Sequence, residues 1–184
     1  MSQINVQYHR TEIGNLVLGS FHGKLCLVGF RHGKARNAAD DRIKKGLEAE
    51  FVEQDDEVLE RTRKQLDEYF GGSRKEFDIP LLQVGTDFQE SVWKALMRVP
   101  YGAVSTYSQL AKDVDNEKAV RAVGNAVGAN PISIVVPCHR IIGSDGGLVG
   151  YGGGLSAKKR LLKLERSNTV LCDDQTKFSK EIKP

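Results

Sequence analysis

Short apolar runs separated by turn residues fill the first 30 positions of the chain. The segments INVQYHR (4–10), LVLGSF (16–21) and LCLVGF (25–30) alternate between apolar and polar positions or form short apolar runs. Both patterns are typical of β-strands. Gly14-Asn15 and His22-Gly23 lie between these segments and are turn signals. The pattern predicts a small antiparallel sheet.

Helical spacing appears next. Residues 39–50 are highly charged and predict a helix, and residues 55–70 predict a second one, with acids first and Gly71-Gly72 as the stop. The segment FDIPL (77–81) predicts a closing strand or an extended connector. No catalytic motif stands out in residues 1–84, which we interpret as a small α/β scaffold domain.

The pattern changes at residue 86. The segment 86–99 predicts a helix capped by Thr86 or Asp87. Residues 105–114 and 117–130 predict two short helices with a tight polar connection, which indicates a helix-turn-helix unit. ISIVVP (132–137) predicts a buried strand, and SAKKRLLKLE (156–165) predicts a helix ending at Glu165.

These elements predict an α/β (α+β) fold in two parts. A small N-terminal antiparallel-sheet domain spans residues 1–84. A mainly helical C-terminal domain, with the helix-turn-helix and a candidate active-site cysteine, spans residues 85–166. Residues 167–184 lack periodicity and predict a disordered tail.

The second helix of the predicted pair is unusually bare. Six of its 14 residues are Gly or Ala, and Arg121 and Asn125 are almost the sole side chains on its outer face. Close helix packing explains such a composition. A slim helix that enters a DNA minor groove, about 6 Å wide, explains it as well.

Composition narrows the class of protein. The chain has 184 residues, 40% apolar and 28% charged, and a net charge of +3, which fits a soluble globular protein. The charge is too small to establish nucleic-acid binding by itself, although the mildly basic second half favours a phosphate-bearing partner. No run approaches the ~20 apolar residues of a membrane span. The N-terminus lacks a secretory-signal pattern. We therefore expect a cytoplasmic protein without a membrane partner.

Cysteine usage leaves one position of chemical interest. Cys26, Cys138 and Cys172 are far apart, with no CxxC, which excludes a disulfide framework and a zinc ribbon. Cys26 is expected to be a small buried hydrophobe and Cys172 an exposed residue of the tail. Cys138 directly precedes His139.

Metal ligation, redox sensing and nucleophilic attack are all open to Cys138. Zinc needs three or four ligands, and the other histidines lie in the first half. A redox sensor needs a resolving cysteine, and none is near. A nucleophile fits best. Neighbours in an extended segment point in opposite directions, so His139 would act through a bridging water, with a carboxylate as its own partner.

Five segments in order carry a family resemblance. They are FQESVW (88–93), VSTYSQLA (104–111), KAVRAVGNAVGANP (118–131), IVVPCHRIIG (134–143) and GYGGGL (150–155), followed by Glu165. With them, residues 86–165 resemble the active domain of the O6-alkylguanine-DNA alkyltransferases, DNA-repair proteins that act once.

The resemblance implies a direct-reversal reaction without cofactor or metal. Cys138 would take the alkyl group of O6-alkylguanine, with O4-alkylthymine as a further candidate substrate, in a single turnover. His139 would deprotonate Cys138 through a water, and Glu165 would hold the imidazole. Asn130 matches the family's hinge asparagine. Tyr107 matches a tyrosine that hydrogen-bonds the guanine ring.

The resemblance also implies how DNA is bound. The partner would be double-stranded DNA carrying O6-alkylguanine, bound through its minor groove by a monomer, with the damaged base flipped out. Arg121 matches the arginine that fills the vacated place. The other positions that match DNA contacts are Tyr107, Ser108, Asn116, Ala122 and Ser144.

Backbone groups are implied to read the guanine. They map to the carbonyls of Cys138 and Ile141 and to the N–H of Gly152, and Tyr151 and Val127 would line the substrate pocket. Gly152 stands where some members carry serine, and Val127 replaces a larger side chain of some relatives. The departure at Gly152 favours a wider pocket.

The competing hypothesis is a non-catalytic, alkyltransferase-like protein that binds the lesion and flags it for another pathway. Such proteins replace the cysteine, so the intact Cys138 favours catalysis. A thiol hydrolase or redox protein, the third class, would leave the arginine-bearing helix unexplained. The zinc-site pattern of some members is not reproduced by His9, His22 and Cys26, so no metal is expected.

Overall fold

The computed structural model describes residues 2–31 and 34–169. Cys172 and residues 170–184 of the predicted tail lie outside this part. Within it, no helix is both long and apolar enough to span a membrane.

The predicted sheet is present, with one strand more. Strands β1 (Ser2–Thr11), β2 (Gly14–Phe21) and β3 (Lys24–Phe30) pair antiparallel, and β4 (Ala49–Glu53) joins β1 in parallel, giving the order β3-β2-β1-β4. Two expectations were wrong. The first turn is at 12–13, because Gly14 already pairs with Thr11. The helix expected over 39–50 is α1 (Lys34–Leu47), and residues 49–53 form the edge strand.

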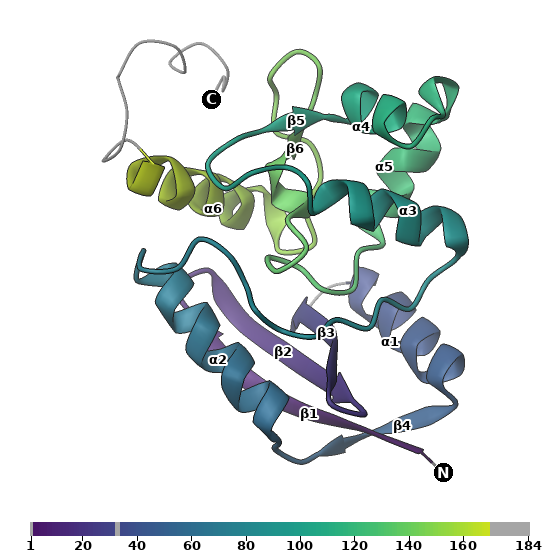
Figure 1. The fold of residues 1–184 in the computed structure, drawn as a ribbon, viewed down its shortest axis with the longest axis vertical. Coiled ribbons are helices and arrows are strands. Elements are labelled where there is room, and N and C mark those ends of the chain that lie inside the picture. The colour runs from purple at the N-terminus through teal and green to yellow at the C-terminus, as the bar shows by residue number, and fades with distance from the viewer. Residues whose placement is uncertain (1, 32–33, 170–184) are drawn as a thin grey trace.

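Two helices lie on opposite faces of this sheet (Figure 1). Leu16 and Leu18 of β2 belong to the same core cluster as Leu66 of α2 (Glu57–Phe70), whereas Val17 belongs to the cluster with Ile43 of α1. This is the period-2 alternation of a strand buried on both sides. The segment 77–81 is an extended connector rather than a regular strand.

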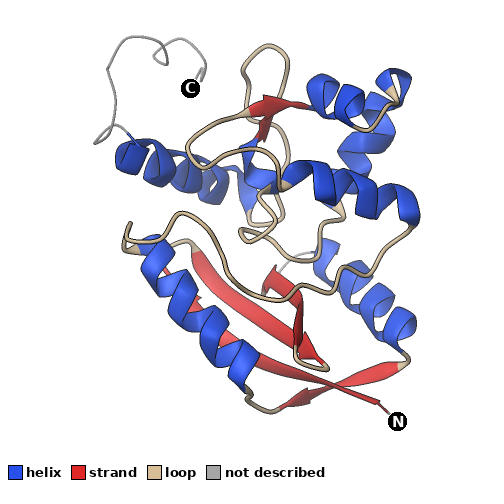
Figure 2. Cartoon of the chain, in the orientation of Figure 1, coloured by secondary structure: helices blue, strands red, loops and turns tan. Residues whose placement is uncertain are grey.

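The second half is mainly helical (Figure 2). Helix α3 (Asp87–Leu96) begins with a capping box between Thr86 and Gln89. The two helices of the predicted pair are α4 (Tyr107–Asp113) and α5 (Val120–Gly128), joined through a 3-10 turn, η1 (Glu117–Ala119). The 3-10 turn η2 (Cys138–Arg140) and a two-stranded pair, β5 (Ser105–Thr106) with β6 (Ile141–Ile142), precede α6 (Gly154–Thr169).

Two more expectations about the second half were wrong. Residues 132–137 are buried but do not form a regular strand, because Ile134 takes a positive φ of 73° and the segment makes only isolated bridges. Helix α6 continues past Glu165 to Thr169, whose hydroxyl donates to the Glu165 carbonyl at 2.7 Å. Residues 167–169 are therefore helical.

The two halves share one apolar core. The cluster that contains Leu16 and Leu66 also contains Trp93 of α3, Val123 of α5 and Leu161 of α6. The fully buried Trp93 donates its indole N–H to the Ala126 carbonyl at 2.8 Å and so connects α3 to α5. The pocket described next lies where the halves meet.

Candidate active site

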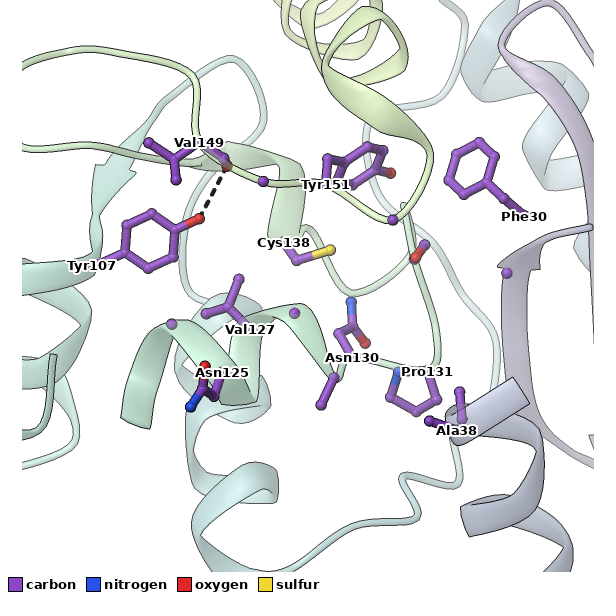
Figure 3. Close-up of a pocket in the computed structure, with 18 of the residues that line it drawn as sticks. Phe30, Ala38, Tyr107, Asn125, Val127, Asn130, Pro131, Cys138, Val149 and Tyr151 are labelled. Carbon is purple, nitrogen blue, oxygen red and sulfur yellow. Dashed lines mark hydrogen bonds between the residues drawn. The ribbon is translucent and has the colours of Figure 1, made fainter. Parts of the chain in front are cut away.

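A pocket of about 760 Å³ opens between the halves of the chain (Figure 3). Its walls come from β3 and α1 on one side, and from α4, α5 and the glycine-rich loop of residues 143–153 on the other. Cys138 lies in the wall, and its sulfur projects into the space between Tyr151 and Asn130. Most of the lining is apolar, as is usual for a small-molecule pocket with few polar groups.

Cys138 is nearly buried, with 7% of its surface exposed. It begins the 3-10 turn η2, so the expectation of an extended segment at Cys138-His139 was wrong. Burial raises the pKa of the thiol, while hydrogen bonding from the Asn130 side chain and the charge of Lys158 act in the opposite direction. The neutral thiol is the resting form at neutral pH, so attack by a thiolate needs a base.

Asn130 holds the segment that leads to Cys138. Its amide donates to the Val136 carbonyl at 2.9 Å and its side-chain oxygen accepts from the Ile132 N–H at 3.0 Å. These two bonds close the chain between α5 and η2 into a compact turn. This geometry explains why an Asn is needed there and why residues 132–137 cannot run straight as a strand.

His139 and Glu165 form a fully buried pair. His139 Nε2 lies 2.8 Å from Glu165 Oε1, and both side chains are 0% exposed. An ionised carboxylate can only accept, so Nε2 carries the proton of this bond and Nδ1 keeps its lone pair. Nδ1 is buried and has no hydrogen-bond partner among the described residues. Burial lowers the pKa of His139 in spite of Glu165, so the imidazole is neutral and able to accept a proton.

Glu165 is held by donors from several elements. Arg140 donates from Nε to Oε2 at 3.0 Å and from Nη2 to Oε1 at 3.0 Å, and Gly102 donates its N–H to Oε2 at 3.0 Å. Gly102 has a φ of +77°, which favours glycine at that turn. Burial by itself would raise the pKa of Glu165, but His139 and Arg140 outweigh it and hold the pKa at about 2.

Aromatic rings form much of the pocket wall. Tyr151 meets Phe30 of β3 edge-to-face at 5.6 Å and lies 6.4 Å from the His139 ring. The Tyr151 hydroxyl is buried without a partner among the described residues. On the other side, Tyr107 donates its hydroxyl to the Val149 carbonyl at 3.3 Å (Figure 3). Val127 of α5 completes this side of the pocket.

Of the positions expected to read guanine, Cys138 and Gly152 line this pocket, whereas Ile141 is fully buried and is not part of its lining. The Ile141 carbonyl already accepts from Lys158 Nζ at 2.5 Å, which leaves its second lone pair for a ligand. Gly152 lines the pocket, and a Cβ built there would meet no atom within 4 Å. The position therefore has space in front of it, in line with the expected wider pocket.

The expected DNA-contact positions divide into two groups. Ser108 and Ser144 are exposed and line the pocket beside Tyr107. Arg121 and Ala122 lie on the exposed face of α5, outside the pocket, and Asn116 is exposed where η1 begins. Arg121 makes no hydrogen bond or ion pair with any described residue, which leaves its guanidinium available to a partner.

Three residues at the site escaped the sequence analysis. Arg140 directly follows His139 but had no role assigned. Lys158 lies seven residues before Glu165, so both share a face of α6 with Leu161 and Leu162. Charged residues at apolar-face spacing were the signal that could have revealed this buried site. Tyr69 gave no such signal, because a tyrosine on the apolar face of a helix is ordinarily a packing residue.

The buried carboxylate predicts a pH-dependent stability. The folded-state pKa of Glu165, about 2, lies below the ordinary 4.5. Its contribution is therefore complete above about pH 5 and is lost as the pH falls from 4.5 toward 2. Glu165→Gln leaves Arg140 buried without its counter-charge, so we expect a loss of about 3 kcal/mol in unfolding free energy at pH 7.

Urea unfolding at pH 7, 4 and 2.5 measures this effect. The difference between wild type and Glu165→Gln should shrink toward the lowest pH. Glu60→Gln, at an exposed position of α2, is the control and should track the wild type. A constant difference between wild type and Glu165→Gln at all three pH values would contradict the depressed pKa.

Similarity to known proteins extends over both halves of the chain. A family model described as the 6-O-methylguanine DNA methyltransferase ribonuclease-like domain matches residues 6–83, and one described as the DNA binding domain of that family matches residues 87–167. A methylated-DNA–protein-cysteine methyltransferase of Methanosarcina acetivorans is 45% identical over 157 residues, covering 85% of this chain and 95% of the relative. One from Methanosarcina barkeri is 50% identical over 158 residues, covering 86% and 94%.

Solved structures of an O6-methylguanine methyltransferase are also similar to this chain. The O6-methylguanine methyltransferase of Mycobacterium tuberculosis superposes with a TM-score of 0.76 at 35% identity, covering 92% of this chain and 99% of that one. A structure of the M. tuberculosis protein in complex with DNA superposes with a TM-score of 0.74 at 38% identity, covering 90% and 94%.

Proposed function

Because the chain belongs to the 6-O-methylguanine DNA methyltransferase family, we propose that Cys138 is the residue that accepts the alkyl group from O6-alkylguanine in DNA. The chain is a methylated-DNA–protein-cysteine methyltransferase, a DNA-repair protein whose partner is DNA. One observation carries the assignment of the acceptor. The Cys138 sulfur faces the pocket, next in the chain to a buried His139 whose Nε2 is held by Glu165 and whose Nδ1 has no partner in the part of the chain that the structure describes.

Proton removal is the first step. The Cys138 thiol loses its proton to His139 Nδ1 through one water, and the imidazolium that forms is stabilised by the Glu165 carboxylate at Nε2. The lowered pKa of His139 keeps it neutral and ready to accept, and the raised pKa of Cys138 keeps the thiol protonated until a substrate arrives. Asn130 and Lys158 favour the thiolate once it forms.

Alkyl transfer is the second step. The thiolate sulfur attacks the carbon attached to O6, a carbon–sulfur bond forms, and the carbon–O6 bond breaks with its electrons going to the guanine. The guanine anion then takes up the proton that His139 received from the Cys138 thiol, so that guanine and the imidazole are both neutral at the end. The thioether on Cys138 is stable, so each molecule reacts once. The same displacement applies to O4-alkylthymine, which we propose as a second substrate.

Base recognition uses backbone groups. We assign the carbonyls of Cys138 and Ile141 and the N–H of Gly152 to hydrogen bonds with the guanine, and the Tyr107 hydroxyl to its ring. A ligand that enters the pocket competes with the Val149 carbonyl for that hydroxyl. The walls that contact the alkyl group are Tyr151 and Val127.

DNA binding uses α4 and α5 as a helix-turn-helix. The bare outer face of α5 approaches the minor groove, and Arg121 fills the space left by the flipped nucleotide, which offsets part of the few kcal/mol that flipping costs. The Arg121 side chain is exposed and has no hydrogen-bond or ion-pair partner among the described residues, which supports this role. Ser108, Asn116, Ala122 and Ser144 are assigned to the DNA contact around it. We propose that one molecule acts alone.

The need for a reduced acceptor thiol also indicates the cellular compartment of the protein. The two cysteines described, Cys26 and Cys138, are both free, and a nucleophilic thiol that acts once has to stay reduced until it meets its substrate. On that ground we place the protein in the cytoplasm.

Intact-protein mass spectrometry tests the proposed acceptor. Incubation with duplex DNA that carries one O6-methylguanine should add one methyl group, about 14 Da, to Cys138 and stop at one equivalent. Peptide mapping should locate the methyl group on Cys138. Tight binding to the lesion without a mass gain would instead favour a non-catalytic lesion-binding protein.

A further inference from the structure

Tyr69 reaches from the first half of the chain into the active site. It lies in the last turn of α2, is 0% exposed, and donates its hydroxyl to Glu165 Oε1 at 2.7 Å. The same oxygen accepts from His139 Nε2 at 2.8 Å. A residue of the sheet-bearing half is therefore one hydrogen bond away from the group that holds His139.

Packing accounts for the Tyr69 ring but not for its hydroxyl. The ring meets Phe70, Phe77 and Tyr101 at centroid distances of 5.4, 5.4 and 6.0 Å. A phenylalanine would make the same ring contacts. Glu165 already has Arg140 as its counter-charge, so a further donor is not needed to compensate the buried carboxylate.

We propose that Tyr69 is a positioning residue for alkyl transfer, whose hydroxyl fixes the Glu165 carboxylate in the orientation that holds His139 with Nδ1 toward Cys138. This inference rests on the proposed function of Cys138, His139 and Glu165. Tyr69 acts through Glu165 and touches neither the substrate nor the sulfur.

The geometry at Glu165 shows what the hydroxyl adds. Arg140 and Gly102 both donate to Oε2, at 3.0 Å each. On Oε1, His139 donates at 2.8 Å and Arg140 Nη2 at 3.0 Å, and the Tyr69 hydroxyl of α2 adds a third donor at 2.7 Å. Without it, the orientation of the carboxylate, and with it that of the His139 ring, is less tightly fixed.

The Tyr69 hydroxyl and His139 Nε2–H both donate to Oε1, so each hydrogen bond weakens the acceptor strength that this oxygen offers the other. Burial first, and then the charge of Glu165, raise the pKa of Tyr69 well above its ordinary value, so its hydroxyl remains a donor throughout the neutral range. Removing this donor makes Oε1 a stronger acceptor for His139 Nε2–H and raises the pKa of the imidazole. The other titratable groups around the pair are Arg140, Lys158, Cys138, Tyr101 and Tyr151, and all of them stay in place in the variant.

Single-turnover kinetics with free O6-benzylguanine test the proposal, because this small substrate removes DNA binding from the measurement. Tyr69→Phe should lower the plateau rate constant about threefold to tenfold, the scale of one ordinary hydrogen bond. The acid limb of its pH–rate profile should move to higher pH. Tyr101→Phe is the matched control. It removes a hydroxyl from the same aromatic cluster, bonded to Asn168 and not to Glu165, and should leave both quantities unchanged.

Thermal unfolding of the three proteins separates positioning from folding. A rate loss in Tyr69→Phe with an unmoved acid limb, matched by a lower folded fraction, would overturn the proposal in favour of a purely structural role. An unchanged rate and profile would overturn it directly. If wild type itself fails to alkylate Cys138, the proposed function fails first; if wild type reacts and Tyr69→Phe equals it, only the positioning role fails.

Discussion

Replacing Cys138 by alanine abolishes alkyl transfer to the protein, while binding to duplex DNA that carries O6-methylguanine stays within about twofold of wild type. The reason is that the sulfur supplies the new bond and its loss leaves no other thiol among the described residues that line the pocket. Mass spectrometry after incubation with the methylated duplex measures the transfer, and fluorescence anisotropy measures the binding.

Cys26→Ala is the matched control for this loss. Cys26 is fully buried in β3, and burial raises its pKa to about 12. This variant should still take up one methyl group per molecule. A collapse of DNA binding in Cys138→Ala equal to its loss of transfer would show that the cysteine is structural, and methylation of Cys138→Ala would show that the acceptor lies elsewhere.

Replacing Arg121 by alanine slows repair of O6-methylguanine in duplex DNA about 100-fold, while the reaction with free O6-benzylguanine changes by less than about twofold. The asymmetry follows from the proposed role. A flipped base leaves a gap in the stack, and the cost of that gap falls on the duplex substrate alone. Single-turnover rate constants on the two substrates measure the difference.

Lys118→Ala distinguishes this role from the general contribution of a positive charge to DNA binding. Lys118 is exposed on η1, three residues before Arg121, and its loss removes the same single positive charge. We expect Lys118→Ala to weaken DNA binding modestly and to leave the repair rate at saturating protein unchanged. Equal losses on both substrates in Arg121→Ala would rule out the role in base flipping.

The arrangement around Glu165 explains why so polar a cluster can be buried. Each oxygen of the carboxylate accepts at least two hydrogen bonds, and Arg140 also donates to the Val99 carbonyl at 2.6 Å. A buried charge is tolerated when its geometry is good and its remaining donors and acceptors are satisfied. Among the described residues, three buried side-chain polar atoms lack a hydrogen-bond partner, Gln83 Nε2, His139 Nδ1 and the Tyr151 hydroxyl, and the last two belong to the site.

The helices of the second half could be predicted because their signals are local. A cap such as Thr86, an apolar face spaced at three and four residues, and a stop after it all lie within one segment. Strands β1 to β3 could also be predicted from local signals, namely their short apolar or alternating runs and the turn residues between them. Edge strand β4 was not predicted, because the short charged segment 49–53 is a strand only through its pairing with β1. Residues 132–137 read as a strand, but the Asn130 side chain bends them into a turn.

The sequence by itself determined the order of the elements, the family resemblance and the chemical candidates Cys138, His139 and Glu165, because periodicity and motifs are recorded along the chain. Only the tertiary structure decided which groups surround those candidates. Tyr69 and Glu165 are 96 residues apart, and nothing local in either segment indicates that they meet. Their contact arises because α2 and α6 pack into one core, and that packing depends on the whole set of apolar faces rather than on any one stretch of sequence.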